Sequence, residues 1–219
     1  MGAAALLLMY SSVPDGEKHH AVASFWVCAI AAGSYLAMAF GQGDVTVNGK
    51  EVFAARYIDW TLTTPLLLLG LLTLGLAGAK RKGIGSFIAG VLAADVFMIA
   101  TGLMASLSSS DTHKWVWYVV SCMAFLGVVY AIWGPVKKAA SEIGVGDLYN
   151  KLAGLLTGLW FIYPVLWVIG TEGTGAISLK AEVAVFAAID LLAKVGFGLM
   201  LVSGVRSLPA KAAEVVEAD

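Results

Sequence analysis

The sequence predicts an all-α membrane protein in which seven transmembrane helices form one bundle and one domain, residues 1–219. Hydrophobic residues make up 59% of the chain and charged residues only 13%, which is more apolar surface than the core of a soluble domain of this size can bury. The apolar residues also fall into segments of about 20, the length that an α-helix needs to cross a bilayer at about 1.5 Å per residue. These observations exclude a soluble protein.

Six segments are long enough to cross the membrane, and shorter, more polar stretches separate them. They lie at residues 20–41, 54–78, 84–106, 113–134, 148–169 and 181–205. A further apolar run at residues 1–12 is too short to cross fully. We expect it to belong to the first of the seven helices, which is either abbreviated or begins upstream of the sequence given.

Two connections have distinctive sequences. VTVNGKEVF, residues 45–53, alternates around Asn48 and Gly49, a pair that favours the tight turn of a two-residue β-hairpin. We expect a short β-ribbon there, on the outer face of the membrane. Residues 134–150 form the longest connection on the opposite face and are expected to be the most mobile loop, and the polar tail, 208–219, is expected to fray.

The basic residues of the connections are distributed unequally between the two faces. If the segments alternate in direction, the hairpin's face holds three lysines: Lys50, Lys114 and Lys180. The other face holds nine basic residues: Lys18, Lys80, Arg81, Lys82, Lys137, Lys138, Lys151, Arg206 and Lys211. Because cytoplasmic loops carry an excess of Lys and Arg, this predicts a multi-pass plasma-membrane protein with its N-terminus outside and its C-terminus in the cytoplasm.

The last segment contains two charged residues at the depth of the bilayer centre, Asp190 and Lys194. They are four residues apart, so they lie on one face of a helix, about one turn from each other. An ion pair that only supports the architecture would explain them, but charges at this depth are costly and are best interpreted as functional. A desolvated lysine also loses its proton readily and forms Schiff bases with aldehydes, so Lys194 is a candidate for covalent attachment of a ligand.

The segment at residues 54–78 carries a polar face. From the outside inward, residues at helical spacing place there a cation, a carboxylate, a hydroxyl, an apolar residue and a glycine: Arg56, Asp59, Thr63, Leu67 and Gly70. Hydrogen bonds to neighbouring helices would account for such a face. A buried aspartate beside an arginine, in a bundle with a second aspartate and a lysine, instead indicates a functional site.

Further stripes recur at helical spacing in three other segments: Asp95, Met98 and Gly102; Tyr118, Ser121, Cys122 and Phe125; and Trp160, Tyr163, Pro164 and Trp167. An aromatic stripe is more often hydrophobic core than ligand pocket. Here the stripes surround one buried lysine, and a flat, elongated, conjugated ligand between aromatic planes accounts for all of them. Asp95 has no charge partner nearby in sequence, so we expect a protonated, structural carboxyl that hydrogen-bonds to a neighbour such as Thr64.

The remaining polar and sulfur-containing residues predict no metal site and no nucleic-acid partner. Cys28 and Cys122 lie in apolar segments and are expected to be core thiols and not a disulfide. His19 and His20 adjoin charged residues and are expected to be solvated loop residues. No CxxC motif or histidine cluster inside the membrane indicates a metal, and no basic stripe indicates nucleic acid.

Three stretches resemble the motifs of microbial rhodopsins, and in particular those of bacteriorhodopsin-type proton pumps: RYIDWTLTTPLLLL, WFIYPVLWVIGTEG and IDLLAKVGFG. The resemblance runs from the second transmembrane helix to the end of the chain. It implies all-trans retinal bound covalently to Lys194 as a Schiff base. It also implies that Asp59 is the primary counterion and proton acceptor, and that Asp190 is the second counterion.

The same resemblance implies roles for further residues. Tyr35 and Arg56 match an extracellular hydrogen-bonded cluster, and Glu172 and Glu182 match a pair that releases the proton and titrates as a unit. A solvated loop carboxylate is the alternative for Glu172, which lies among glycines. The other matching positions surround the retinal: Tyr57, Trp60, Thr63, Thr64, Leu67, Met98, Gly102, Ser121, Trp160, Tyr163, Pro164, Trp167 and Ala193. The pocket predicted from the stripes and the resemblance together also includes Tyr118 and Phe125.

Two positions depart from the family's pattern. The family's internal proton donor is an acid at the position of Gly70, and glycine cannot donate a proton. Reprotonation from the cytoplasm must then use water or a surface carboxylate, with Glu142 and Asp147 as candidates, which predicts slow, pH-dependent recovery. Members that bind a carotenoid antenna have glycine at the position of Tyr118, so no antenna is expected.

The resemblance implies a light-driven outward proton pump, a primary ion transporter and not an enzyme, that works in the lipid bilayer and is expected to form a homo-oligomer. The alternative is a sensory photoreceptor that signals through a partner, since sensors commonly lack the internal donor. The presence of both Glu172 and Glu182 favours the pump. Halide and sodium pumps are disfavoured, because they carry other residues in place of the motif Asp59–Thr63–Gly70.

Overall fold

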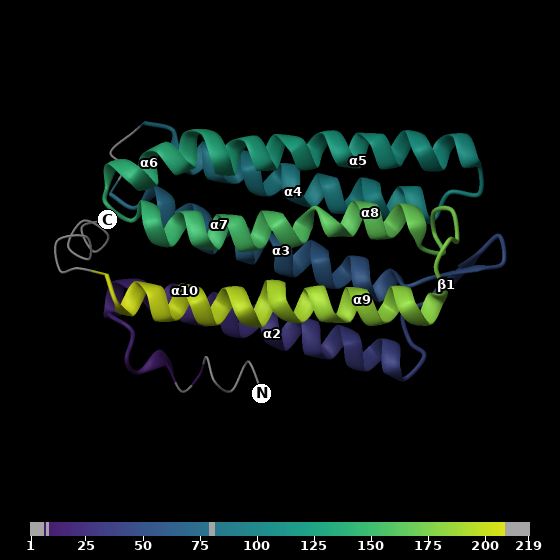
Figure 1. The fold of residues 1–219 in the computed structure, drawn as a ribbon, viewed down its shortest axis with the longest axis horizontal. Helices are drawn as coiled ribbons and strands as arrows, with labels where there is room; N and C mark the ends of the chain where they lie inside the picture. The colour runs from purple at the N-terminus through teal and green to yellow at the C-terminus, as the bar shows by residue number, and fades with distance from the viewer. Residues whose placement is uncertain (1–6, 8, 79–81, 209–219) are drawn as a thin grey trace.

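A computed structural model gives the fold of residue 7 and of residues 9–78 and 82–208. Within these residues, six helical segments are long and apolar enough to cross a membrane. They lie side by side along the long axis of the molecule, with their connections at its two ends (Figure 1). Most of the apolar run at residues 1–12, and the tail after residue 208, lie outside the described residues. The short first helix and the frayed tail therefore stay predictions.

Most helix boundaries fall within a few residues of the predicted ones. In chain order the helical elements are η1 (Asp15–Glu17), α2 (Lys18–Ala39), α3 (Ala54–Leu76), α4 (Ile84–Ser106), α5 (Asp111–Ala131), η2 (Ile132–Val136), α6 (Lys137–Glu142), α7 (Gly146–Trp160), α8 (Ile162–Ile169), α9 (Leu179–Leu191), η3 (Leu192–Gly196) and α10 (Phe197–Arg206). The elements η2 and η3 are π-helical turns inside longer helices. Each of the last three spans consists of two or three consecutive elements.

One end of the bundle, the hairpin end, holds the strands β1 (Val45–Val47) and β2 (Lys50–Val52), which pair antiparallel. Asn48 and Gly49 form the turn between them, with φ of 51° and 74°. Positive φ at both central residues is what a two-residue hairpin turn with the right twist requires. The predicted hairpin is confirmed.

The opposite end, the basic end, carries the described members of the larger basic set: Lys18, Lys82, Lys137, Lys138, Lys151 and Arg206. The hairpin end carries the smaller set, as the alternation of the segments predicts. Lys80, Arg81 and Lys211 lie outside the described residues.

The connection that was expected to be the most mobile loop is mostly helical, so this prediction is wrong. α5 continues through η2 into α6, and only residues 143–145 separate α6 from α7. The hydroxyl of buried Tyr149 donates a hydrogen bond to the backbone oxygen of Ile132 at 2.7 Å, which holds the turn against the core. Ala139 and Ala140 pack inward from α6 while its charged residues face outward, and one and a half turns are too short for sequence periodicity to reveal such a face.

The two adjacent histidines do not lie in a loop, so their prediction is wrong as well. η1 starts the helical segment at Asp15, and His19 and His20 therefore occupy the first turn of α2. Neighbouring helix residues point about 100° apart, so one ring faces water while the other faces the bundle. His19 is exposed and His20 is only 1% exposed.

α3 is the central helix of the bundle. In its most apolar stretch 61% of the residues are buried within the protein, against 22% for α4 at the periphery. Toward the basic end, leucines fill a close-packed core between α3, α7 and α10: Leu68, Leu71, Leu72, Leu152, Leu156 and Leu201. Large apolar side chains such as Phe97, Met123 and Val165 are exposed on the outside, as expected where lipid covers the helices. The protein is a multi-pass membrane protein.

Candidate functional site

The amine of Lys194 lies between two aspartates in the middle of the bundle. Its Nζ atom donates a hydrogen bond to Oδ2 of Asp59 and lies 3.3 Å from Oδ2 of Asp190. All three side chains are buried. The predicted contact between Asp190 and Lys194, one turn apart, is confirmed, and Asp59 comes from α3. One cation between two acids leaves the cluster negatively charged when all three groups are ionised.

Local backbone structure places two of these groups. Lys194 is the middle residue of the π-helical turn η3, and such turns are frequent at functional sites because the extra residue redirects the side chain. On α3, the hydroxyl of Thr63 donates to the backbone oxygen of Asp59 at 2.8 Å. The Thr63 hydroxyl is therefore bound to the backbone of its own helix, one turn before it.

Asp190 is held by several neutral donors. The hydroxyl of Tyr35 donates to its Oδ2 at 2.7 Å, and the hydroxyl of Tyr163 donates to its Oδ1 at 2.5 Å. The indole N–H of Trp60 donates at 3.3 Å to Oδ1. Oδ1 of Asp59, by contrast, accepts no hydrogen bond from any described residue. Asp190 therefore accepts hydrogen bonds from three side chains besides its contact with Lys194.

An apolar cavity lies between the helices beside this cluster. Fifteen residues line it: Tyr57, Trp60, Thr64, Met98, Ile99, Gly102, Tyr118, Ser121, Cys122, Phe125, Trp160, Tyr163, Pro164, Trp167 and Phe186. Thr63, Leu67, Ala193 and Lys194 were predicted for the pocket and are buried, but they do not line this cavity. Trp60 and Tyr163 belong both to the cavity wall and to the donors of Asp190, so the cavity reaches the charged cluster.

Two lining residues were missed by the sequence reasoning. Phe186 precedes Asp190 by four residues on α9, so helical spacing could have found it. Ile99 follows Met98 on α4, and no pattern distinguishes it from the lipid-facing residues of that helix. Cys122 was part of the predicted stripe and was left out of the predicted pocket.

Flat aromatic faces form the cavity walls. Tyr118 and Trp167 stack with ring centroids 4.8 Å apart and planes at 19°. Trp60 meets Tyr163 edge to face at 5.2 Å. A flat conjugated chain fits between such surfaces, because its faces contact aromatic rings over their whole area.

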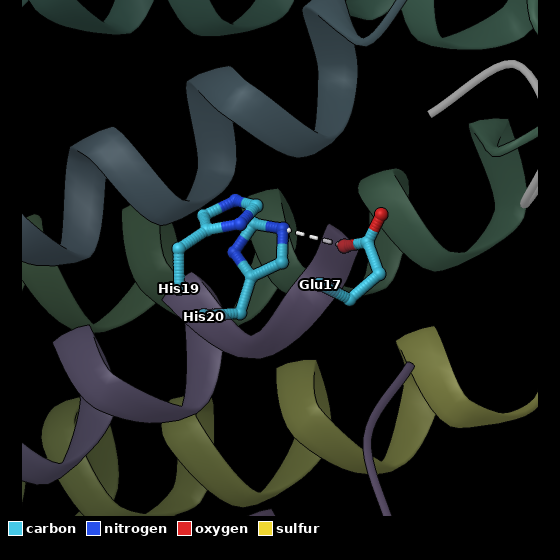
Figure 2. A group of neighbouring side chains, drawn as sticks. All are labelled: Glu17, His19 and His20. Atoms are coloured by element: carbon cyan, nitrogen blue, oxygen red, sulfur yellow. Dashed lines mark ion pairs between the residues drawn. The ribbon is translucent and has the colours of Figure 1, made fainter. Parts of the chain in front are cut away.

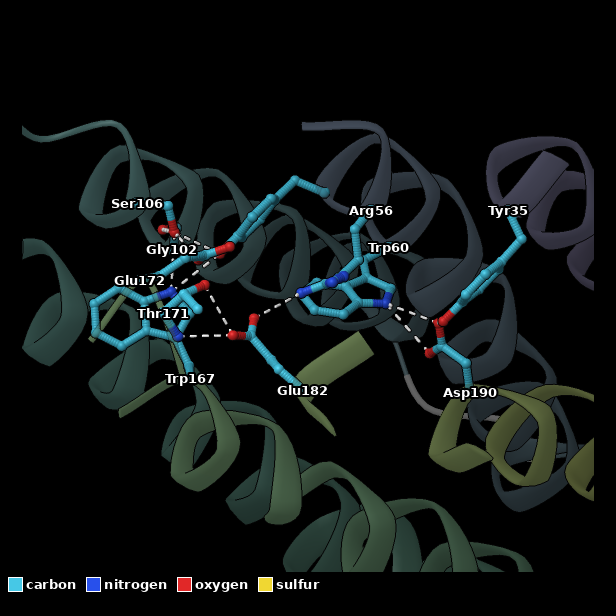
Figure 3. Close-up of polar contacts among 11 residues, drawn as sticks. Tyr35, Arg56, Trp60, Gly102, Ser106, Trp167, Thr171, Glu172, Glu182 and Asp190 are labelled. Atoms are coloured by element: carbon cyan, nitrogen blue, oxygen red, sulfur yellow. Dashed lines mark hydrogen bonds and ion pairs between the residues drawn. The ribbon is translucent and has the colours of Figure 1, made fainter. Parts of the chain in front are cut away.

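Figure 3 shows a second polar group, around Arg56, Glu182 and Glu172, beside Asp190 and its donors. Arg56 donates to Oε1 of Glu182 at 3.3 Å, and both side chains are buried. The hydroxyl and the backbone N–H of Thr171 donate to Oε2 of Glu182 at 2.9 and 2.7 Å. The guanidinium of Arg56 also lies 4.2 Å from the ring centroid of Phe186, a cation–π contact. Arg56 thus pairs with Glu182, not with Asp59 on its own helix.

Glu172, in the connection between α8 and α9, forms the outermost part of this network. Its Oε2 accepts hydrogen bonds from the hydroxyls of Ser106 and Tyr57, the latter at 2.5 Å. Trp167 donates from its indole N–H to both hydroxyls, at 2.9 and 3.0 Å. Glu172 is buried, so the alternative of a solvated loop carboxylate is wrong. Among the described residues, no hydrogen bond joins Glu172 directly to Glu182.

Burial raises the pKa of the Glu172 carboxyl above its ordinary value of 4.5. The hydrogen bonds from Ser106 and Tyr57 and the charge of Arg56 act in the opposite direction, and the negative charge of Glu182 adds to the increase. The two acids are therefore coupled through their charges.

Asp95 has the partner that the sequence predicts. The hydroxyl of Thr64 lies 2.7 Å from Oδ2 of Asp95 and 2.8 Å from the backbone oxygen of Trp60. The Thr64 hydroxyl is the donor to Asp95, so the predicted hydrogen bond is confirmed. The protonated state and the structural role of Asp95 stay predictions.

The α3 face has no acid on the basic side of Asp59. It continues through Leu67 to Gly70, both buried next to the leucine core. Glu142 and Asp147, the surface candidates for reprotonation, are both exposed at the basic end. The acids predicted to accept and release the proton therefore lie near Lys194 and toward the hairpin end. The predicted surface acids, Glu142 and Asp147, lie at the opposite end.

Comparison with known proteins agrees with this geometry. Residues 1–208 match the family described as bacteriorhodopsin-like protein. The chain belongs to this family. Archaerhodopsin-3 from Halorubrum sodomense is 41% identical over 193 residues, which cover 85% of this chain and 72% of that protein.

Solved structures of the family have the same fold. The thermophilic rhodopsin from Rubrobacter xylanophilus matches with a TM-score of 0.91 and 39% identity, over 100% of this chain and 93% of that one. The rhodopsin of Coccomyxa subellipsoidea, a light-driven proton pump, matches with a TM-score of 0.84 and 36% identity, over 92% and 89% of the two chains.

Members of the bacteriorhodopsin-like family bind retinal covalently through a lysine Schiff base. The residues present here fit that group. Lys194 is the only buried lysine among the described residues, and the cavity beside it has flat aromatic walls. The protein is therefore a retinal-binding member of the family.

Proposed function

We propose that this protein is a light-driven outward proton pump with retinal bound to Lys194. The observation that carries the proposal is the unequal distribution of polar groups on the two sides of the Lys194 amine. Toward the hairpin end, acids and hydroxyls follow one another as far as Glu172. Toward the basic end, the α3 face carries Leu67 and Gly70 beside packed leucines. A proton that leaves the amine therefore meets its acceptors on one side.

When bound, retinal supplies a light-driven change of shape that alters the proton affinity of the nitrogen to which it is attached. The protein's own residues hold it in place and provide the proton path. The stacked rings of Tyr118 and Trp167 and the edge of Trp60 confine a flat chain, and the apolar cavity excludes water from it.

We assign Asp59 as the proton acceptor. Its Oδ2 already accepts a hydrogen bond from Nζ of Lys194, so transfer moves one proton along an existing contact. Asp190 is held as an anion by three other donors and keeps the charge of the site balanced. Two carboxylates with the same partner but different surroundings thus take different roles.

We assign Arg56, Glu182 and Glu172 to proton release. Arg56 lies one turn from Asp59 on α3, so neutralising Asp59 removes a negative charge that balanced it. The guanidinium then interacts more strongly with the acids at the hairpin end. Burial holds the pKa of Glu172 above its ordinary value, and a positive charge that is less compensated lowers that pKa and favours release of a proton from this carboxyl.

Outward transport requires the hairpin end to face the outside of the cell. The excess of lysine and arginine at the basic end supports this orientation, with the C-terminal side of the chain in the cytoplasm of a plasma membrane. The predicted span at residues 148–169 divides at Phe161, between α7 and α8. Pro164 in this span lacks the N–H that would bond to the backbone oxygen of Trp160. This break can act as a hinge that opens the basic side.

We infer that the amine recovers its proton slowly, because Gly70 offers no carboxyl to return it. The recovery of visible absorbance after a laser flash tests this inference when it is measured over roughly two pH units on either side of neutral. We expect the rate to fall steadily as pH rises. A rate that stays constant above about pH 6 would contradict slow, pH-dependent recovery.

A sensory photoreceptor remains the second candidate, and Gly70 is the observation that favours it. A sensor and a pump would share the cavity and Lys194. They differ in net transport, because a sensor returns its proton to the side from which it came. Light-driven acidification of the medium by cells that contain the protein therefore separates the two.

A further inference from the structure

The space beside Gly70 contains a polar ring from another helix. A Cβ atom added at Gly70 would lie 3.8 Å from Nδ1 of His20 on α2. Its other neighbours would be hydrocarbon, at 3.1 Å from Leu201 and 3.9 Å from Phe197, both on α10. The imidazole of His20 therefore lies beside the space that a side chain at position 70 of α3 would occupy.

His20 forms a buried ion pair with Glu17. Its Nε2 lies 3.0 Å from Oε2 of Glu17 (Figure 2), and each of the two residues is only 1% exposed. Apart from this pair, neither side chain has a hydrogen-bond partner among the described residues. One edge of the ring thus faces an acid, and the other edge, Nδ1, faces the Gly70 side of the bundle.

The surroundings of the pair distinguish its two sides. His19 is exposed, and its ring centroid lies 4.0 Å from that of His20. Water that contacts the His19 ring at the basic end is therefore close to the Glu17–His20 pair. On the inner side, Gly70, Leu201 and Phe197 carry no titratable group. The titratable neighbours of His20 among the described residues are Glu17 and His19, both on its own helical segment.

A purely architectural role explains this arrangement poorly. Burying an imidazole and a carboxylate costs desolvation energy, and apolar residues of similar size would fill the same space without that cost. The free Nδ1 edge also gains no hydrogen bond from its position. A group that must hold and release a proton at this place does need such a polar edge.

We propose that Glu17 and His20 together are the proton donor of the basic side and take over the role that Gly70 cannot perform. This proposal rests on the proposed pump function. The pair holds one exchangeable proton as a unit. The N–H bond at Nδ1 breaks and the proton moves inward to the nitrogen of Lys194 that has lost its own proton, where a new N–H bond forms. His20 is then neutral, with Nε2–H facing the Glu17 carboxylate. A proton from water at the basic end then recharges the pair.

The decisive variant is His20→Gln, with His113→Gln as its matched control. His113 is exposed at the opposite end of the bundle, so the same chemical change there leaves the basic side intact. We expect His20→Gln to slow the recovery of absorbance after a flash on the order of 100-fold at neutral pH, the usual scale for removal of a proton-transfer group. Millimolar imidazole in the medium should restore much of the rate, and His113→Gln should recover like the parent protein.

Glu17→Gln provides a second, independent variant. We expect it to change the pH profile of the recovery and slow it, because the amide cannot share the proton. Side-chain ¹⁵N NMR of the dark protein gives a readout that does not depend on transport. Glu17→Gln should shift the signals of one histidine ring, His20, and leave that of His113 unchanged.

The outcomes separate this proposal from the proposed function. A parent protein that forms its colour but does not acidify the medium would contradict the pump itself. A parent protein that pumps, together with a His20→Gln variant that recovers at the parent rate, would overturn the donor proposal alone. If His20→Gln yields no folded protein, an unchanged pH profile and unchanged histidine signals in Glu17→Gln would overturn it instead.

Discussion

Asp59 and Asp190 contact the same amine of Lys194, but only Asp190 is held by further donors. Tyr35, Tyr163 and Trp60 belong to three different helical segments and all converge on Asp190. The pair is therefore asymmetric in its hydrogen bonding although both acids are buried. This asymmetry supports the proposal that Asp59 takes the proton and that Asp190 stays charged.

Asp59→Asn should abolish proton transport and leave the protein coloured, because the amide occupies the same space and cannot accept the proton. We expect light-driven acidification to fall by at least about 100-fold. Asp44→Asn, at an exposed position of the hairpin end, is the matched control and should transport normally. Full transport by Asp59→Asn would mean that another acid is the acceptor.

Glu172 should make the dark protein less stable as pH rises. Its pKa is raised in the folded protein, so the folded state keeps a proton that the unfolded chain releases from its ordinary value of 4.5 upward. Unfolding then releases a proton, and stability falls with increasing pH until the folded pKa is passed. Thermal unfolding between mildly acidic and neutral pH should show this slope in the parent protein and a flatter one in Glu172→Gln. Glu51→Gln, exposed on β2, should keep the parent slope.

Gly102→Leu should prevent colour formation with added all-trans retinal. A Cβ at Gly102 would lie 3.5 Å from Oγ of Ser121, which is an ordinary contact, so Gly102→Ala should still bind. The longer leucine would extend into the cavity that Gly102 lines. Gly90→Leu on the same helix is the control, because a Cβ there meets nothing within 4 Å. Equal colour in both leucine variants would show that retinal does not occupy this cavity.

Asp95→Asn should transport protons like the parent protein, because we expect the role of Asp95 to be structural. The amide can still donate to Thr64, whose hydroxyl lies 2.7 Å from Oδ2 in the parent protein. Thr64→Val should instead leave a buried carboxyl without its partner and lower the free energy of unfolding by about 1–3 kcal/mol. Loss of transport in Asp95→Asn at normal stability would place Asp95 in the proton path.

Periodicity within single helices allowed much of the site to be predicted. The spacing of Asp190 and Lys194 predicts their contact, and the stripes on α4, α5 and the α7–α8 span predict most of the cavity. Asn48 and Gly49 predict the hairpin, because a turn of this kind depends on local residue types.

Features that depend on packing between distant segments could not be predicted in this way. The pairing of Arg56 with Glu182 joins residues 126 positions apart, and nothing in either helix favours it over Asp59. His20 looked solvated because its sequence neighbours are charged, while its burial depends on Gly70 and α10. The helical connection at α6 depends on the Tyr149 hydrogen bond to η2, which no short pattern reveals.

The most direct test of the account is the pH of an unbuffered suspension of cells that contain the protein and all-trans retinal, under green light. The account predicts acidification that a protonophore abolishes and that is absent in Asp59→Asn. A coloured protein that leaves the pH unchanged in the light would contradict outward proton transport and favour the sensory function.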